Sequence, residues 1–248
     1  MQKIMKQTFY TIVAFAVIFI AACTKDSASS SSADGSSSNG SLTRFITVGN
    51  YLYTVDFKNL KAYDISNPAT PVLKTTTAIG FNIETIFPYG DKLFIGSNQN
   101  MFIYSISNPE APTKLSEVAY FVRGNDPIVV KDTTAYSTLR VGTGGRLSVF
   151  NIKNINTPIN VNTTFLNSPY GLGIKDSALY ICEGQNGLKI FSIYKPHLPV
   201  LKKQISNAET FYDVIVENNI LFCYIKGGIY LYDISNIYNP AFISFIKN

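Results

Sequence analysis

The chain has 248 residues, of which 46% are hydrophobic and 15% are charged, and its formal net charge is +5. The basic residues form no block and no arginine-rich helix, so the composition gives no support for nucleic-acid binding. His197 is the one histidine of the sequence. We therefore expect neither a zinc site nor a histidine-based catalytic triad, and we expect no other cofactor.

Residues 1–22 have the pattern of an export signal. Lys3 and Lys6 precede an apolar stretch from Phe9 to Ala22, which is shorter than the roughly 20 residues that a membrane-spanning helix needs. The sequence Ile-Ala-Ala-Cys that ends at Cys23 then resembles the lipobox of bacterial lipoproteins. That resemblance implies that cleavage leaves Cys23 at the new N-terminus with lipid attached. An ordinary secretory signal with a chance cysteine is the alternative.

Residues 23–43 are expected to form the lipidated cysteine and a tether. Serine, glycine and other small polar residues dominate this segment, and such a composition buries too little apolar surface to fold. Thr24 rather than aspartate follows Cys23, which resembles the pattern of outer-membrane lipoproteins. The resemblance implies an outer-membrane, cell-envelope protein that contacts the membrane through its lipid alone; the leaflet and the face of that membrane are left open.

The remainder of the chain, residues 44–248, repeats one phrase five times. The phrase is an apolar and aromatic run followed by a polar turn that ends in proline. Its copies are Leu60–Pro71, Met101–Pro112, Leu147–Pro158, Leu188–Pro199 and Ile229–Pro240. The aromatic residues at their fourth positions are separated by 41, 46, 41 and 41 residues. A constant period of this size indicates a repeat architecture.

One repeat, residues 83–122, contains four short β-type runs separated by turns. The runs cover residues 83–87, 93–96, 101–106 and 114–120. Tight turns between successive strands predict an antiparallel meander, and no stretch of the repeat has the apolar period of a helix. A single meander leaves both sheet faces uncovered, so we predict a five-bladed β-propeller of four-stranded antiparallel blades. Its ring would close by packing of the first blade on the last; an open solenoid or a sandwich is the alternative.

The phrase at Leu60–Pro71 resembles the LVIVD repeat, a family of repeats of about 40 residues. The resemblance extends over all five units and is weakest at residues 194–197. It implies a β-propeller of exported bacterial and archaeal surface proteins. It carries no catalytic motif, so it says little about activity, and we expect a binding protein rather than an enzyme.

The repeat varies in length on one face of the predicted propeller. The extra residues of the long interval fall at Leu139–Arg146, and the links between blades lie on the same side. Because loops on a rigid scaffold usually carry binding, we predict that a protein or a glycan binds here. The candidate contacts are Phe81, Phe121, Arg123, Arg140, Arg146, Tyr170, Phe211 and Tyr212. The glycines within Leu139–Arg146 predict a hairpin tip rather than a phosphate-binding loop, because no helix follows them.

A glycan-cleaving hydrolase is the second hypothesis. Glu84 and Asp126 each stand ten residues before an aromatic residue of a second strand, which predicts that both lie at the mouth of the central channel. Asp213 lies near the same level in the fifth repeat, two positions out of register. Glycosidases use carboxyl pairs of this kind as acid and nucleophile or base.

Cys182 and Cys223 are one repeat apart in the same predicted strand of neighbouring blades. Side chains at equivalent positions of two blades would point the same way and not at each other. We therefore predict two buried free thiols rather than a disulfide. The sequence gives no indication of the oligomeric state.

Overall fold

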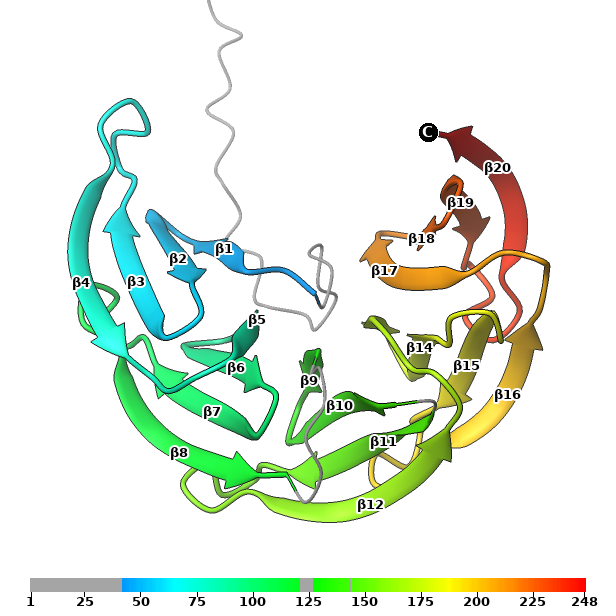
Figure 1. The fold of residues 1–248 in the computed structure, drawn as a ribbon, viewed down its shortest axis with the longest axis horizontal. Helices are drawn as coiled ribbons and strands as arrows, with labels where there is room; N and C mark the ends of the chain where they lie inside the picture. Colours follow the sequence, from blue (N-terminus) through cyan, green and yellow to red (C-terminus); the bar gives the residue numbers. More distant parts are fainter. Residues whose placement is uncertain (1–41, 121–126, 143) are drawn as a thin grey trace, which may run out of the picture. The chain divides into compact units, whose positions relative to one another are not determined.

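The computed structural model describes residues 42–120, 127–142 and 144–248. These residues form five antiparallel sheets of four strands each and no helix (Figure 1). The first sheet contains β1 (Phe45–Val48), β2 (Tyr51–Val55), β3 (Asn59–Asp64) and β4 (Val72–Ala78). The second contains β5 (Ile83–Tyr89), β6 (Lys92–Ser97), β7 (Asn100–Ser105) and β8 (Thr113–Ala119).

The other three sheets repeat this pattern. The third contains β9 (Ile128–Lys131), β10 (Thr134–Val141), β11 (Gly144–Asn151) and β12 (Ile159–Leu166). The fourth contains β13 (Leu172–Lys175), β14 (Ala178–Cys182), β15 (Leu188–Ser192) and β16 (Val200–Ile205). The fifth contains β17 (Phe211–Glu217), β18 (Ile220–Ile225), β19 (Gly228–Asp233) and β20 (Ala241–Lys247). In every sheet the strands are hydrogen-bonded in chain order, which confirms the predicted meander and the five-bladed propeller.

The sheets follow one another around a common centre, with their first strands innermost and their fourth strands on the outer rim (Figure 1). The first strand of the array begins at Phe45 and the last strand is Ala241–Lys247, where the repeat places them. The expected signal, lipidated cysteine and most of the tether lie outside the described residues. Among the described residues, no helix has the length and apolar character needed to span a membrane.

Each sheet has a register shift between its third and fourth strands at the aromatic residue of the repeated phrase. The shifts fall next to Tyr63, Tyr104, Phe150, Phe191 and Tyr232. A bulge bends its strand and increases the local twist. The repeat therefore encodes the curvature of the outer strand as well as the turn that precedes it.

Apolar side chains packed between neighbouring sheets hold the array together. One cluster joins the first and second sheets, a second joins the second, third and fourth, and a third joins the fourth and fifth. Most of the first, second and third strands of the sheets are therefore buried on both faces. Their near-continuous apolar runs reflect this two-sided burial.

A tyrosine of the second strand connects a sheet to the next one at three places. The hydroxyl of Tyr53 donates to the carbonyl of Pro109 at 3.0 Å, and that of Tyr136 donates to the carbonyl of Pro196 at 3.0 Å. The hydroxyl of Tyr180 donates to the carbonyl of Ile237 at 2.8 Å. In each case the acceptor is in the turn after the third strand of the following sheet, so the proline-containing turn is part of the inter-sheet contact.

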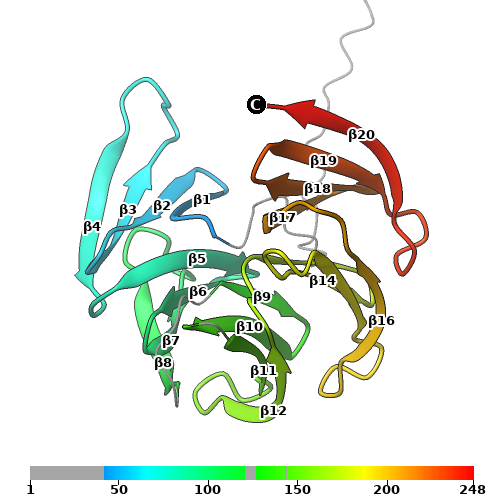
Figure 2. The same ribbon diagram turned by 45° about the vertical axis from the view of Figure 1, so that its right-hand side comes forward.

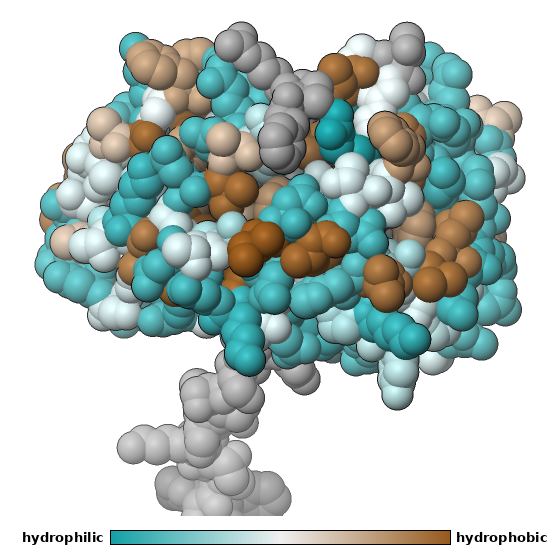
Figure 3. Space-filling model, turned by 90° about the horizontal axis from the view of Figure 1, so that it is seen from below, coloured by the Kyte–Doolittle hydropathy of each residue, from teal (hydrophilic) through white to brown (hydrophobic). Residues whose placement is uncertain are grey.

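The outer rim exposes several apolar side chains of the fourth strands. Examples are Val72, Leu73, Ile159, Phe165, Leu201 and Ile243. On the side of the rim seen in Figure 3, hydrophobic residues form separate clusters among hydrophilic ones. Lys74 in β4 and Lys202 in β16 place charges on these edge strands, which disfavours pairing with another strand.

The ring does not close by packing of the first sheet on the last, contrary to the expectation from the sequence. Strand contacts join β5 to β1 and β2, β9 to β5 and β6, β13 to β9, and β17 to β13 and β14. No comparable contact joins the first and fifth sheets within the described residues, and the two stand apart in Figures 1 and 2. The side chains between sheets set the rotation from each sheet to the next, and the four rotations that relate the five sheets leave an open arc.

Cys182 and Cys223 are buried free thiols, as predicted. Both lie in the cluster between the fourth and fifth sheets, so one points forward along the array and the other points back. The expectation that they point the same way was wrong, because the two residues have opposite alternation within their second strands. Burial raises the pKa of both thiols, which keeps them protonated.

The Tyr180 hydrogen bond gives a test of the inter-sheet contact. Tyr180→Phe should lower the free energy of unfolding by about 1 kcal/mol, because the buried Ile237 carbonyl loses its donor. Urea-induced unfolding measures the change. Tyr194→Phe is the control, since that side chain is 82% exposed. Equal effects of the two substitutions would contradict this role of Tyr180.

Candidate functional site

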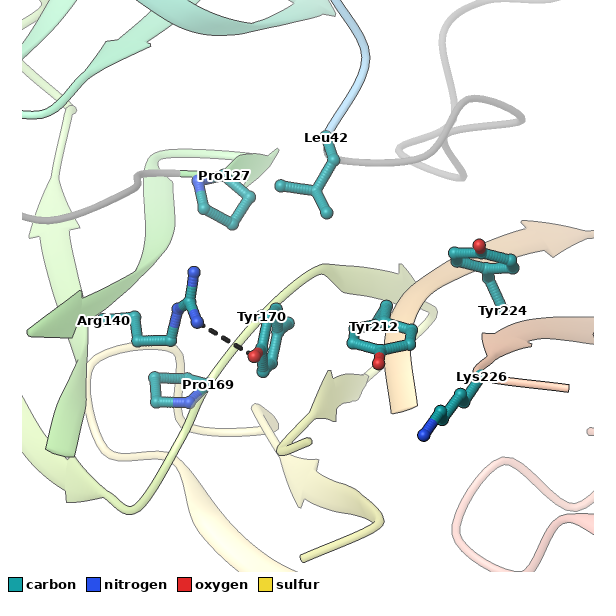
Figure 4. A pocket seen from close by; sticks show the side chains of 8 residues that line it. All are labelled: Leu42, Pro127, Arg140, Pro169, Tyr170, Tyr212, Tyr224 and Lys226. Carbon is teal, nitrogen blue, oxygen red and sulfur yellow. Dashed lines mark hydrogen bonds between the residues drawn. The ribbon is translucent and has the colours of Figure 1, made fainter. Parts of the chain in front are cut away.

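A pocket of about 490 Å³ opens on the face of the propeller that carries the variable loops (Figure 4). The end of β10, the link into β13, the start of β17, and the end of β18 with the turn after it supply most of its wall. The lining residues are Leu42, Pro127, Arg140, Pro169, Tyr170, Tyr212, Tyr224 and Lys226. Three of the residues that the sequence proposes for ligand contact, Arg140, Tyr170 and Tyr212, meet in it.

Three tyrosines form a ladder across the pocket. The ring centroids of Tyr170 and Tyr212 are 5.4 Å apart with an interplanar angle of 87°. Those of Tyr212 and Tyr224 are 5.7 Å apart with an angle of 40°. The first pair is edge-to-face and the second is tilted, and aromatic contacts at these distances stabilise the ring orientations. The ladder is therefore a preformed aromatic wall contributed by one inter-sheet link, which holds Tyr170, and by strands β17 and β18.

Arg140 stands over one end of the ladder. Its Cζ is 4.3 Å from the centroid of the Tyr170 ring, and its Nη1 donates to the Tyr170 hydroxyl at 2.9 Å. The hydroxyl of Thr138 donates to the Tyr170 carbonyl at 2.6 Å, which fixes the backbone of the same link. Lys226 lines the opposite side of the pocket, beside Tyr224 (Figure 4). The aromatic wall thus carries a cationic group at each end.

Two tyrosines of the ladder, Tyr170 and Tyr212, occupy a position that recurs in every repeat. Tyr53, Phe94, Tyr136, Tyr180 and Phe222 hold the same place in the second strands, where each pairs with the first and third strands. The residues ten positions earlier are Thr43, Glu84, Asp126, Tyr170 and Tyr212. Two of them, Glu84 and Tyr212, are skipped by register shifts in β5 and β17, which frees their side chains from the strand pairing.

The carboxyl groups proposed for hydrolysis are not gathered into a described site. Asp126 lies outside the described residues. Glu84 is half-buried in β5; burial raises the pKa of its carboxyl, and the charges of Arg44 and Arg140 oppose that shift. Asp213 lies beside the backbone of Gly171, where an added Cβ would be 1.8 Å from its Oδ1. In the fifth repeat the position equivalent to Glu84 holds Tyr212, not an acid.

The other proposed ligand contacts lie apart from the pocket or are buried. Arg146 lines a separate depression with Tyr120 and Phe150. Phe81 is 65% exposed and lies 5.0 Å from the ammonium of Lys58. Phe211 is fully buried between the fourth and fifth sheets, so it packs in the core and offers no surface to a ligand. Phe121 and Arg123 lie outside the described residues.

The sequence did not single out Leu42, Pro127, Pro169, Tyr224 and Lys226 as pocket residues. Tyr224 and Lys226 precede the turn between β18 and β19, which is on the predicted binding face. That turn does not differ in length from most of its equivalents, so length variation did not reveal it. Within the described residues, no group of three histidine, cysteine or acidic residues could hold a metal ion.

The family model of the LVIVD repeat matches residues 43–78. Solved structures with the same fold include the periplasmic gluconolactonase PpgL of Pseudomonas aeruginosa, at 11% identity and a TM-score of 0.66. The alignment covers 80% of this chain and 68% of that one. The described residues therefore form a β-propeller whose first repeat matches the LVIVD repeat.

Other solved structures resemble this propeller in fold alone. A putative 6-phosphogluconolactonase of Bacteroides uniformis aligns at 11% identity and a TM-score of 0.67, covering 82% of this chain and 70% of that one. BamB of Moraxella catarrhalis aligns at 10% identity and a TM-score of 0.57, covering 73% and 53%. The aligned part of this chain thus spans between 53% and 70% of the lengths of these proteins. No curated protein matches its sequence.

The raised pKa of Glu84 gives a prediction about pH. The folded protein holds this proton at pH values at which the unfolded chain has released it, so ionisation of Glu84 destabilises the fold as the pH rises. The stability of Glu84→Gln relative to the wild type should therefore increase between about pH 3.5 and pH 7. Urea unfolding across this range measures the difference.

Glu117→Gln, at an exposed carboxylate of β8, is the control and should show no such increase. A relative stability of Glu84→Gln that falls with rising pH would mean that the arginines, and not burial, dominate at this site.

Proposed function

We propose that this propeller is a non-enzymatic binding module of the bacterial cell envelope that recognises a protein or a glycan at the tyrosine-lined pocket. The observation that carries the proposal is the ladder of Tyr170, Tyr212 and Tyr224 between Arg140 and Lys226. Aromatic walls with a few polar groups are the usual composition of ligand sites, and tyrosine supplies both an apolar face and a hydroxyl.

The proposal places the protein at the outer membrane through lipid on Cys23. Its support is the sequence alone: the apolar stretch that ends in Ile-Ala-Ala-Cys, and the polar segment that follows. A tether of about 20 residues of this composition would have a reach of roughly 25 Å, enough to hold the binding face clear of the headgroups.

The fold comparisons agree with a role in binding. One similar chain comes from a yeast assembly in which Dbp5 is bound to Nup159, Gle1, IP6 and ADP, at 9% identity and a TM-score of 0.55. This chain covers 60% of that one. The likeness extends to the fold only, so the nature of the ligand has to come from experiment.

A glycan array probed with the full chain in detergent tests the proposal for glycans, and each positive glycan is then titrated to measure its affinity. For protein ligands, purified envelope proteins are titrated in the same way. Tyr212→Ala and Arg140→Ala should each weaken binding about tenfold or more, a loss of about 1.4 kcal/mol. Tyr194→Ala, which removes an exposed tyrosine from a turn away from the pocket, should leave the affinity unchanged. Binding that survives both pocket substitutions would refute this site.

The alternative is a glycan-cleaving hydrolase. The observation in its favour is the raised pKa of the Glu84 carboxyl, because a general acid has to hold its proton at the pH of the reaction. Under that alternative, Glu84→Gln abolishes release of reducing sugar from a bound glycan while binding persists. Intact glycan after prolonged incubation with the wild type would exclude it for the glycans tested.

A further inference from the structure

The open arc leaves two sheet faces without a neighbouring sheet. We call the side of a sheet that points to the next sheet in the chain its trailing face, and the opposite side its leading face. Four contacts in the array each join a trailing face to the leading face that follows. The trailing face of the fifth sheet and the leading face of the first sheet have no such partner in the described chain (Figures 1 and 2).

The trailing face of the fifth sheet has the same design as the buried ones. In the first sheet, Tyr53 pairs across the strands with Ile46 and Ala62, and all three are at most 1% exposed. In the third sheet, Tyr136 pairs in the same way with Val129 and Val149 and is equally buried.

The equivalent row in the fifth sheet is Phe222 with Ile215 and Leu231. These side chains are apolar, yet Phe222 and Leu231 are only half-buried and Ile215 is 37% exposed. Tyr224 of the same face is 49% exposed. The face therefore presents the residues of an inter-sheet contact to solvent.

The leading face of the first sheet matches those that receive such a contact. Leu52 pairs with Tyr63 across β2 and β3, as Leu93 pairs with Tyr104 in the second sheet. Leu93 and Tyr104 are 0% and 3% exposed against the first sheet, whereas Leu52 and Tyr63 are half-buried. Phe45 on the same face is 63% exposed.

The neighbouring row on this leading face is more polar than its interior counterpart. Thr54 pairs with Lys61, where the second sheet has Ile95 paired with Phe102. Contacts between separate molecules are more polar than a permanent core. The leading face of the first sheet thus has an apolar centre bordered by groups that tolerate water.

We propose that a second copy of this chain is the occupant, its first sheet docking by the leading face on the trailing face of the fifth sheet. Each chain carries one face of each kind, and the arc keeps the two faces of one chain apart. A different copy therefore supplies the complement, in the same sheet-on-sheet arrangement that recurs four times within the chain. Such a head-to-tail contact is heterologous. It therefore adds further copies to the assembly unless the rotation between copies closes it into a ring.

Sedimentation of the full chain in density-matched detergent tests the proposal. The weight-average mass should rise at least twofold as the protein concentration increases from about 1 to 100 µM, the range in which a micromolar contact forms. Phe222→Lys, on the trailing face, and Leu52→Lys, on the leading face, should each remain at the mass of one copy. Phe165→Lys changes an 85% exposed rim residue and should associate like the wild type.

Mixing the two variants makes the test directional. Phe222→Lys retains an intact leading face and Leu52→Lys retains an intact trailing face, so an equimolar mixture should form pairs and nothing larger. Circular dichroism of each variant checks that it is folded. We expect both variants to fold, because Phe222 and Leu52 are only half-buried and a lysine side chain can reach solvent there. A wild-type chain that stays at the mass of one copy throughout would overturn the proposal, as would association that survives Leu52→Lys and is lost only with Phe222→Lys.

Discussion

The structure depends on the burial of apolar sheet faces between neighbouring blades. A four-stranded meander hides little of its own surface, and each sheet of this chain becomes stable because it packs on its neighbouring sheet or sheets. The tyrosines at positions 53, 136 and 180 add a directed contact to this non-directional one, since each donates to a carbonyl of the following sheet. The turns that end in proline in the second, fourth and fifth sheets present those carbonyls.

The binding face follows from the same scaffold. The position ten residues before the second-strand aromatic is occupied by Glu84 in β5 of the second sheet, and by Tyr170 and Tyr212, which line the pocket, in the fourth and fifth repeats. The sheets are held rigidly by their packing, so substitutions at these positions change the pocket without changing the fold. Sites on such frameworks are set by a few loop side chains, and here those side chains are aromatic and cationic.

The period of the repeat was sufficient to predict the sheets, their strand order and the limits of the array, because alternation and turns are local properties. Arg140, Tyr170 and Tyr212 were also found, since loop length marks the face on which they lie. Phe211 was misplaced because a register shift beside it turns the side chain into the core. The open arc could not be predicted either, because the rotation between sheets depends on the side-chain volumes packed between them and not on any single repeat.

The arc has a consequence for how the protein loses its structure. The second, third and fourth sheets each have two neighbours, while the first and the fifth have one. In an array of nearest-neighbour contacts, a terminal unit opens at a lower free energy than an internal one. Amide protons of β1–β4 and β17–β20 should therefore exchange with solvent earliest, by local fraying from the two ends, while the central three sheets persist as one cooperative block.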